Sequence, residues 1–157
     1  MAFSRWHQWM DRGGRPNAMA RAINRLTALV HSSGVSRDYL VTLEVVGRKS
    51  GKIISFPLAM AVVDGKRYLV SMLGPEANWV QNLKAAGWDA TLRHGITERI
   101  CLHEIPVSER PPILKAYLKI APGARPHIPV SVDAPLTEFE AVAVDYPVFR
   151  VETMDGP

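Results

Sequence analysis

The sequence lacks what a disulfide-bonded, membrane-spanning or secreted protein needs. Its single cysteine, Cys101, excludes an intramolecular disulfide and a zinc site built on paired cysteines. Its longest apolar stretch, residues 56–63, is far shorter than the roughly 20 residues of a bilayer-spanning helix. Three arginines, Arg5, Arg12 and Arg15, interrupt every apolar stretch near the N-terminus, so no secretory signal is predicted. We therefore expect a cytoplasmic protein.

Several catalytic signatures are missing as well. The sequence has no Gly-x-Ser-x-Gly elbow and no P-loop. Its 5 histidines show no metal-ligand spacing, so no metal site is expected. In a helix Glu138 and Glu140 would lie about 200° apart, so they form no paired-carboxylate site. Cys101 lies within a predicted strand and is interpreted as an inert buried thiol.

The composition is typical of one globular domain. The chain has 157 residues, of which 47% are apolar and 22% charged, and we predict a single domain over residues 1–157. The net charge of +4 comes from one segment, because residues 1–38 hold 6 arginines and 2 aspartates while charges balance in the rest. The body is therefore neutral and the N-terminal segment is basic.

Residues 1–31 are predicted to form a basic amphipathic arm. Met19, Ile23 and Leu26 recur at helical spacing, which predicts a helix over residues 17–31. Two interpretations of this arm stay open. In the first, the arm makes peripheral contact with an anionic membrane surface. In the second, its helix packs over an open end of the body. The neutral body, with few aromatic residues, disfavours a nucleic-acid partner.

From residue 39 onward the pattern is typical of strands. Val41, Leu43 and Val45 alternate with polar residues, which predicts a half-buried strand. Further strands are expected over residues 53–63, 68–73, 88–93, 97–105 and 146–151. Pro57 places the second strand at an edge or a bulge, because proline cannot donate to a ladder.

Helices are predicted between these strands. One opens at Pro75 after the third strand and ends at Gly87. A second is capped by Ser108, and a short one covers residues 136–143. Tight turns between consecutive strands indicate antiparallel pairing. We predict an α+β fold, a small antiparallel β-barrel with peripheral helices, and a two-layer α+β sandwich is the alternative.

The densest polar cluster is the predicted turn over residues 47–52. Arg48, Lys49 and Lys52 place cations, and Ser50 a hydroxyl, on a glycine-flanked turn between two strands. Such a turn can present backbone N–H groups, a hydroxyl and positive charge to one anion, for which phosphate or carboxylate is the natural guest. The alternative is an ordinary charged hairpin.

A second candidate site covers residues 71–83. The strand end at Ser71 is followed by Gly74, which allows a ligand to approach the backbone closely, and by a helix N-terminus. Trp79 and Asn82 lie three residues apart on one side of that helix. This pair suits a planar, hydrogen-bonding guest. The alternative is a core tryptophan beside a solvated asparagine.

Taken in order, these features form a known pattern. The pattern comprises Gly47-Arg48-Lys49-Ser50-Gly51, Pro57-Leu58, Asp64-Gly65, Ser71, Trp79 and Asn82-Leu83. With these gaps, the sequence resembles the deazaflavin-dependent nitroreductase and quinone reductase family of actinobacteria. The resemblance implies a split β-barrel of the flavin-reductase-like, FMN-binding type. It also implies coenzyme F-420, a 5-deazaflavin with a phosphate and an oligoglutamate tail, rather than FMN.

The resemblance further implies roles for individual residues. Arg48, Lys49 and Ser50 would hold the phosphate and the acidic tail. Pro57 and Leu58 would lie beside the deazaflavin ring. The remaining wall of the cofactor groove would come from Ser71, Trp79 and Asn82.

The sequence departs from the family pattern in places. Ile54 stands where the family usually has an arginine, which removes one anion contact, and Met72 stands where members often carry a lysine. Quinone-reducing members carry tyrosines after the last long helix, whereas residues 120–129 contain none. In that loop His127 is the candidate proton donor, because histidine titrates near neutral pH, and water is the alternative donor.

Two functions are consistent with these residues and with the resemblance. The first is an oxidoreductase that transfers a hydride from reduced coenzyme F-420 to an electron-poor acceptor: a quinone, a nitro compound or an unsaturated lactone. The second is a non-catalytic carrier or sensor that binds a flavin-like or hydrophobic ligand in the same barrel. In both, the partner is a small molecule.

Overall fold

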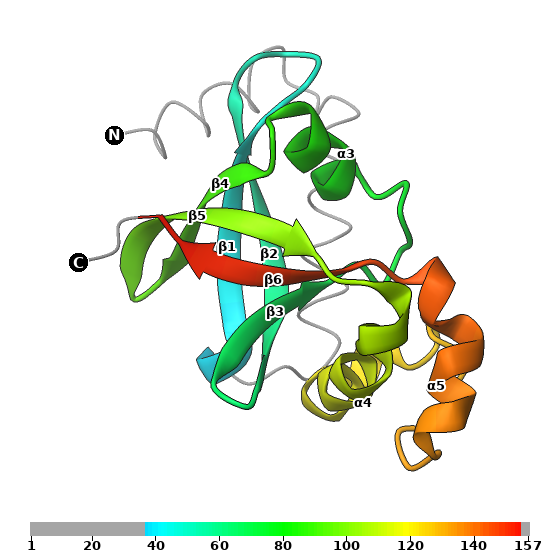
Figure 1. The fold of residues 1–157 in the computed structure, drawn as a ribbon. Helices are drawn as coiled ribbons and strands as arrows, with labels where there is room; N and C mark the ends of the chain where they lie inside the picture. Colours follow the sequence, from blue (N-terminus) through cyan, green and yellow to red (C-terminus); the bar gives the residue numbers. More distant parts are fainter. Residues whose placement is uncertain (1–36, 155–157) are drawn as a thin grey trace.

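The computed structural model describes residues 37–154, which form a closed β-barrel with helices on its outside (Figure 1). Its strands are β1 (Leu40–Val46), β2 (Ile53–Val63), β3 (Lys66–Val70), β4 (Asp89–His94), β5 (Ile96–Glu104) and β6 (Val148–Thr153). Each strand pairs antiparallel with its neighbours in the order β1-β2-β3-β6-β5-β4. The predicted antiparallel barrel is confirmed, and the alternative of a two-layer sandwich is wrong.

The helices lie on two sides of this barrel. They are α3 (Asn78–Ala85), α4 (Arg110–Ile120) and α5 (Leu136–Val142), with short 3-10 helices η1 (Arg37–Tyr39), η2 (Val107–Glu109), η3 (Pro122–Ala124) and η4 (Ala143–Asp145). The α3 helix lies near the β1–β2 turn, whereas α4 and α5 pack together far from it, with α4 against β2 (Figure 1). Across residues 37–154, none of the helices has the length and apolarity needed to cross a membrane.

The predicted arm over residues 1–31, with its helix over residues 17–31, lies outside the described residues. It therefore stays a prediction, as does the single domain over residues 1–157.

Alternation along the strands builds the core. In β1, Val41, Leu43 and Val45 are buried, as the two-residue period predicts. Phe149 of β6 is fully buried, and its ring meets Trp79 of α3 edge-on, with 5.5 Å between the ring centroids. This aromatic contact fixes α3 against the barrel.

Pro57 lies in the half of β2 that has one neighbour. β2 pairs with β1 along residues 53–59, where Pro57 is opposite Thr42, but it pairs with β3 only from Met60 to Val63. Of the predicted edge or bulge, the structure shows the edge, because the β1–β2 register is continuous and residue 57 falls outside the β2–β3 ladder.

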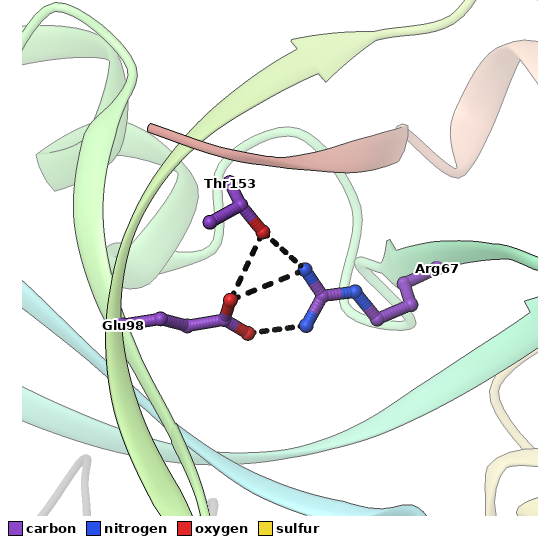
Figure 2. Close-up of polar contacts among 3 residues, drawn as sticks. All are labelled: Arg67, Glu98 and Thr153. Carbon is purple, nitrogen blue, oxygen red and sulfur yellow. Dashed lines mark hydrogen bonds and ion pairs between the residues drawn. The ribbon is translucent and has the colours of Figure 1, made fainter. Parts of the chain in front are cut away.

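A polar cluster ties β3, β5 and β6 together (Figure 2). The Arg67 guanidinium pairs with the Glu98 carboxylate and donates to Thr153 Oγ1 at 2.9 Å, and that hydroxyl donates to Glu98 Oε2 at 3.0 Å. The hydrogen bond from Arg67 is the main reason that the pKa of Glu98 is lowered. Because the three side chains satisfy one another, this network stabilises the barrel.

The segment between β3 and α3 differs from the prediction. The third strand ends at Val70 rather than residue 73, and α3 begins at Asn78 rather than Pro75. The cause is a turn in which Ser71 Oγ donates to the Gly74 carbonyl at 2.5 Å, while the Gly74 N–H donates to the Ser71 carbonyl at 3.2 Å. Local hydrogen bonds therefore compete with both the strand and the helix here.

Ser108 does not cap α4. It lies in η2, and α4 begins at Arg110, whose side chain is only 6% exposed. The guanidinium donates to Glu104 Oε2 at 2.8 Å and to the carbonyls of Ile105 at 3.2 Å and Ala143 at 3.0 Å. The predicted cap is wrong because a buried arginine, not a hydroxyl, holds this helix start.

Candidate functional site

The turn over residues 47–52 connects β1 to β2, and its tip is basic and exposed. Arg48, Lys49 and Ser50 all face solvent. Local bonds shape the turn, because the Gly47 N–H donates to the Lys52 carbonyl at 2.7 Å and the Lys52 N–H donates to Ser50 Oγ at 3.2 Å. The predicted anion-binding turn therefore has its cations and hydroxyl on the surface.

Asn82 of α3 joins this turn to the helix. Its side chain is fully buried, and Oδ1 accepts hydrogen bonds from the Arg48 backbone N–H at 3.2 Å and from Arg48 Nη1 at 2.6 Å. Arginine carries only donors, so the amide oxygen faces Arg48 and the amide nitrogen faces away. The structure thus brings together two candidate segments that are separate in the sequence.

Asn82 Nδ2 is buried and has no hydrogen-bond partner among residues 37–154. A buried donor left unpaired costs about 1–3 kcal/mol. Nδ2 has no exposed surface, so the groups that suit an anionic guest are the exposed cations and the hydroxyl of the turn. A deazaflavin with a phosphate and a carboxylate tail belongs to that class, so the residues present fit coenzyme F-420 at its anionic end.

Ile54, where the resemblance predicts an arginine, is fully buried beneath the turn. A Cβ built on Gly47 would lie 2.6 Å from Ile54 Cδ1 and 2.9 Å from Ser50 Oγ, so a larger residue at 47 would have to displace these side chains. The Ile54 side chain faces the core and brings no charge to the surface. Residue 54 therefore adds no cation to those of the turn.

Pro57 and Leu58 lie on opposite faces of β2. Leu58 is 5% exposed and belongs to the core, whereas Pro57 is half-buried. Neighbouring residues in a strand point to opposite faces. The structure therefore does not bring the two together on one surface, and Pro57 is the one with an accessible side.

Ser71 and Trp79 are both buried with partners inside the protein. The Ser71 hydroxyl donates to the Gly74 carbonyl, and Trp79 is 3% exposed and packs on Phe149. Trp79 is thus a core residue, whereas Asn82 is buried rather than solvated. Their roles in cofactor binding stay predictions.

His127 lies on the loop between η3 and α5, and its side chain is half-buried. Across residues 37–154, no hydrogen bond or ion pair joins it to Arg48 or Asn82. Its backbone carbonyl accepts a hydrogen bond from the Tyr146 hydroxyl at 2.5 Å.

Tyr146 is the residue that sequence reasoning did not connect with this loop. Burial, with Asp145 nearby, raises the pKa of Tyr146. Tyr146 was not among the predicted site residues, because no local pattern shows that it meets a loop 19 residues away.

Solved structures with similar folds agree with this architecture. A structure of an F420-H2 dependent reductase, FDR-A, has a TM-score of 0.53 at 23% identity, covering 75% of this chain and 97% of its own. A domain-swapped dimer has a TM-score of 0.52 at 20% identity, covering 83% and 96%. A Listeria innocua protein named for pyridoxamine 5'-phosphate oxidase has a TM-score of 0.52 at 8% identity, covering 84% and 93%. These matches establish the split-barrel fold.

Among curated proteins, none matches this chain. The model of the F420H(2)-dependent quinone reductase family matches residues 20–99, which include the basic turn, β2 and the whole of α3. The match thus covers half of the chain and both segments that Arg48 and Asn82 connect. The resemblance found in the sequence is confirmed, and the chain belongs to the F420H(2)-dependent quinone reductase family.

Proposed function

We propose that this protein transfers a hydride from reduced coenzyme F-420 to an electron-poor small molecule, with quinones as the first acceptor class to test. Family membership supports the cofactor and the reaction type. The observation that carries the proposal is the contact between Arg48 and Asn82, which joins a cationic turn to the helix beside it. Nitro compounds and unsaturated lactones are the other acceptor classes.

The chain's own residues would bind and orient the cofactor, which supplies the hydride when bound. Arg48 and Lys49 would hold the phosphate and the acidic tail through charge-assisted hydrogen bonds, and Ser50 would add a hydroxyl. Pro57, the accessible residue of its pair, would contact the ring. Ser71 and Trp79 would support this wall from within the protein.

Titration with coenzyme F-420, followed by intrinsic tryptophan fluorescence, tests the binding step. Oxidation of the reduced cofactor, with and without a quinone, then tests the reaction. We expect saturable binding and acceptor-dependent oxidation. Binding without oxidation would instead support a non-catalytic carrier or sensor. FMN is the matched control ligand, and tighter binding of FMN than of F-420 would contradict the cofactor assignment.

His127 is the proposed proton donor to the reduced acceptor. Replacement by alanine should lower turnover on the order of 10²-fold while F-420 affinity stays unchanged, which is the effect expected for a general acid. Stopped-flow oxidation and fluorescence titration measure the two quantities separately. A turnover within about threefold of the wild type would assign the proton to water instead.

A further inference from the structure

The two partners in the Arg48–Asn82 contact are held very differently. Asn82 lies on a helix that buries Leu83 completely and Trp79 to 3% exposure. The end of α3 is also fixed, because the Gly87 N–H donates to the Lys84 carbonyl at 3.2 Å. Asn82 therefore projects from a well-packed element.

The tip of the turn, in contrast, is exposed. The backbone bonds of residues 47–52 described above run within the turn. The bonds from Arg48 reach a residue 34 positions further along the chain. They therefore connect the exposed tip to the packed part of the molecule.

We propose that Asn82 is a positioning residue, which holds Arg48 and with it the tip of the basic turn in place for binding an anion. The inference rests on the proposed function and deepens it, because it gives Asn82 an effect on cofactor affinity that acts through Arg48. The guanidinium has five N–H donors, and the contact with Asn82 leaves most of them for an anion. Ordering this side chain before binding removes part of the entropy cost of binding.

The amide group suits this role better than the alternatives. An aspartate could accept the same two hydrogen bonds, but its charge would cancel that of Arg48. An apolar residue would avoid the unpaired Nδ2, but it could not hold Arg48. Asparagine fixes the guanidinium and leaves its charge for the ligand.

Hydrogen exchange at the Arg48 amide tests the contact itself, without any ligand. In the Asn82→Ala variant the amide loses its acceptor and should exchange at least about tenfold faster. The Asn82→Asp variant has nearly the same volume and retains an acceptor, so the amide should stay protected. An unchanged exchange rate in Asn82→Ala would overturn the proposal.

Two deazaflavin ligands test the consequence for binding. Asn82→Ala should weaken binding of coenzyme F-420 by about tenfold, and should change binding of the same deazaflavin without phosphate and glutamates by less than about twofold. Asn82→Asp should also lose affinity for F-420 rather than for the neutral ligand, because it neutralises Arg48. If the alanine variant does not fold, Asn82→Leu, which has no acceptor, replaces it as the test. An equal loss for both ligands, or no loss for F-420, would overturn the inference while leaving the proposed function standing. A wild type that does not bind F-420 would overturn both.

A double-mutant cycle tests whether Asn82 acts through Arg48. In an Arg48→Ala background only the backbone N–H bond to Asn82 Oδ1 is left, so adding Asn82→Ala should weaken F-420 binding by clearly less than the about tenfold expected in the wild type. Full additivity of the two changes would show that Asn82 contributes independently of Arg48 and would overturn the proposal.

Discussion

Two polar clusters lie near opposite ends of β2, and their hydrogen bonds are distributed differently. Near the β2–β3 hairpin, Arg67, Glu98 and Thr153 satisfy one another (Figure 2). At the β1–β2 turn, Asn82 holds Arg48, but the buried Nδ2 has no partner among residues 37–154. The complete network stabilises the barrel, whereas at the turn the exposed guanidinium keeps donors that its contact with Asn82 does not use. The two clusters therefore differ in whether their donors are used within the fold or face solvent.

The largest expected effect belongs to the turn. Lys49→Ala should weaken F-420 binding by about 10- to 150-fold, because a charge-assisted contact contributes about 1.5–3 kcal/mol. The melting temperature should not change, since Lys49 is exposed. Fluorescence titration measures the affinity.

Lys66→Ala is the matched control, because Lys66 is an exposed lysine at the start of β3, beside the other cluster. It should bind F-420 like the wild type. An equal loss in both variants would show an effect of net charge alone and remove the turn from the site.

The second largest effect is on stability and concerns the cluster of Arg67, Glu98 and Thr153. Glu98→Gln should lower the free energy of unfolding by about 1–2 kcal/mol, because it converts charge-assisted hydrogen bonds to neutral ones, and F-420 affinity should not change. Urea unfolding at neutral pH measures the loss. A stability equal to that of the wild type would show that this cluster contributes nothing to the fold.

The same variant has a defined pH dependence. Arg67 lowers the pKa of Glu98 in the folded state, so the unfolded chain takes up the proton more readily. The stabilisation is therefore present above the ordinary pKa of glutamate, about 4.3, and is lost as the pH falls through the lower folded value. The wild type and Glu98→Gln should converge in stability at acid pH, and a difference that is constant with pH would contradict this assignment.

Much of the fold could be predicted because the sequence carries local signals for it. The alternation of Val41, Leu43 and Val45 located β1, and β2 covers residues 53–63 as expected. At the β2–β3 hairpin, Asp64 and Gly65 adopt φ of 51° and 76°, which only a few residue types accept readily. Periods and turn residues are properties of short segments, so they can be recognised without the rest of the structure.

The partners of the polar side chains could not be predicted in this way. The contact of Arg48 with Asn82, and that of Tyr146 with the His127 carbonyl, join residues 34 and 19 positions apart. Ser71 was expected to face a ligand, yet its hydroxyl bonds to a carbonyl in its own turn. Helical spacing predicts that Trp79 lies beside Asn82 on α3. It cannot predict that the folded barrel places the basic turn against the same side of the helix, where Arg48 contacts Asn82.

The third effect is a weak dependence of binding on salt. Ile54 is buried and uncharged, so it adds no cation for the acidic tail of F-420 to meet. We expect Kd to rise by less than about tenfold between about 0.05 M and 0.5 M salt. Titrations in sodium chloride measure this dependence, and a steeper rise would mean that cations elsewhere in the chain also contact the tail.

The smallest effect concerns Cys101 on β5, which lies outside both clusters and is half-buried rather than buried as predicted. Burial first, and then the charges of Asp89 and Glu152, raise the pKa of its thiol. Since the thiolate is the reactive form, alkylation by iodoacetamide at pH about 8 should be a few times slower than for a free cysteine, and Asp89→Asn should speed it up. Mass spectrometry measures the rate, and reaction as fast as a model thiol would contradict the interpretation of Cys101 as inert.

The position of Pro57 has a consequence for how the protein behaves beside other chains. Residues 53–59 of β2 pair with β1 but with no second strand among those of residues 37–154. Such an open strand is where a foreign extended segment can add, which is a common start of aggregation. Pro57 lies in the middle of this stretch and has no N–H to donate. A foreign strand added along residues 53–59 would therefore find no donor at residue 57, which makes this stretch a poorer template for intermolecular β-sheet.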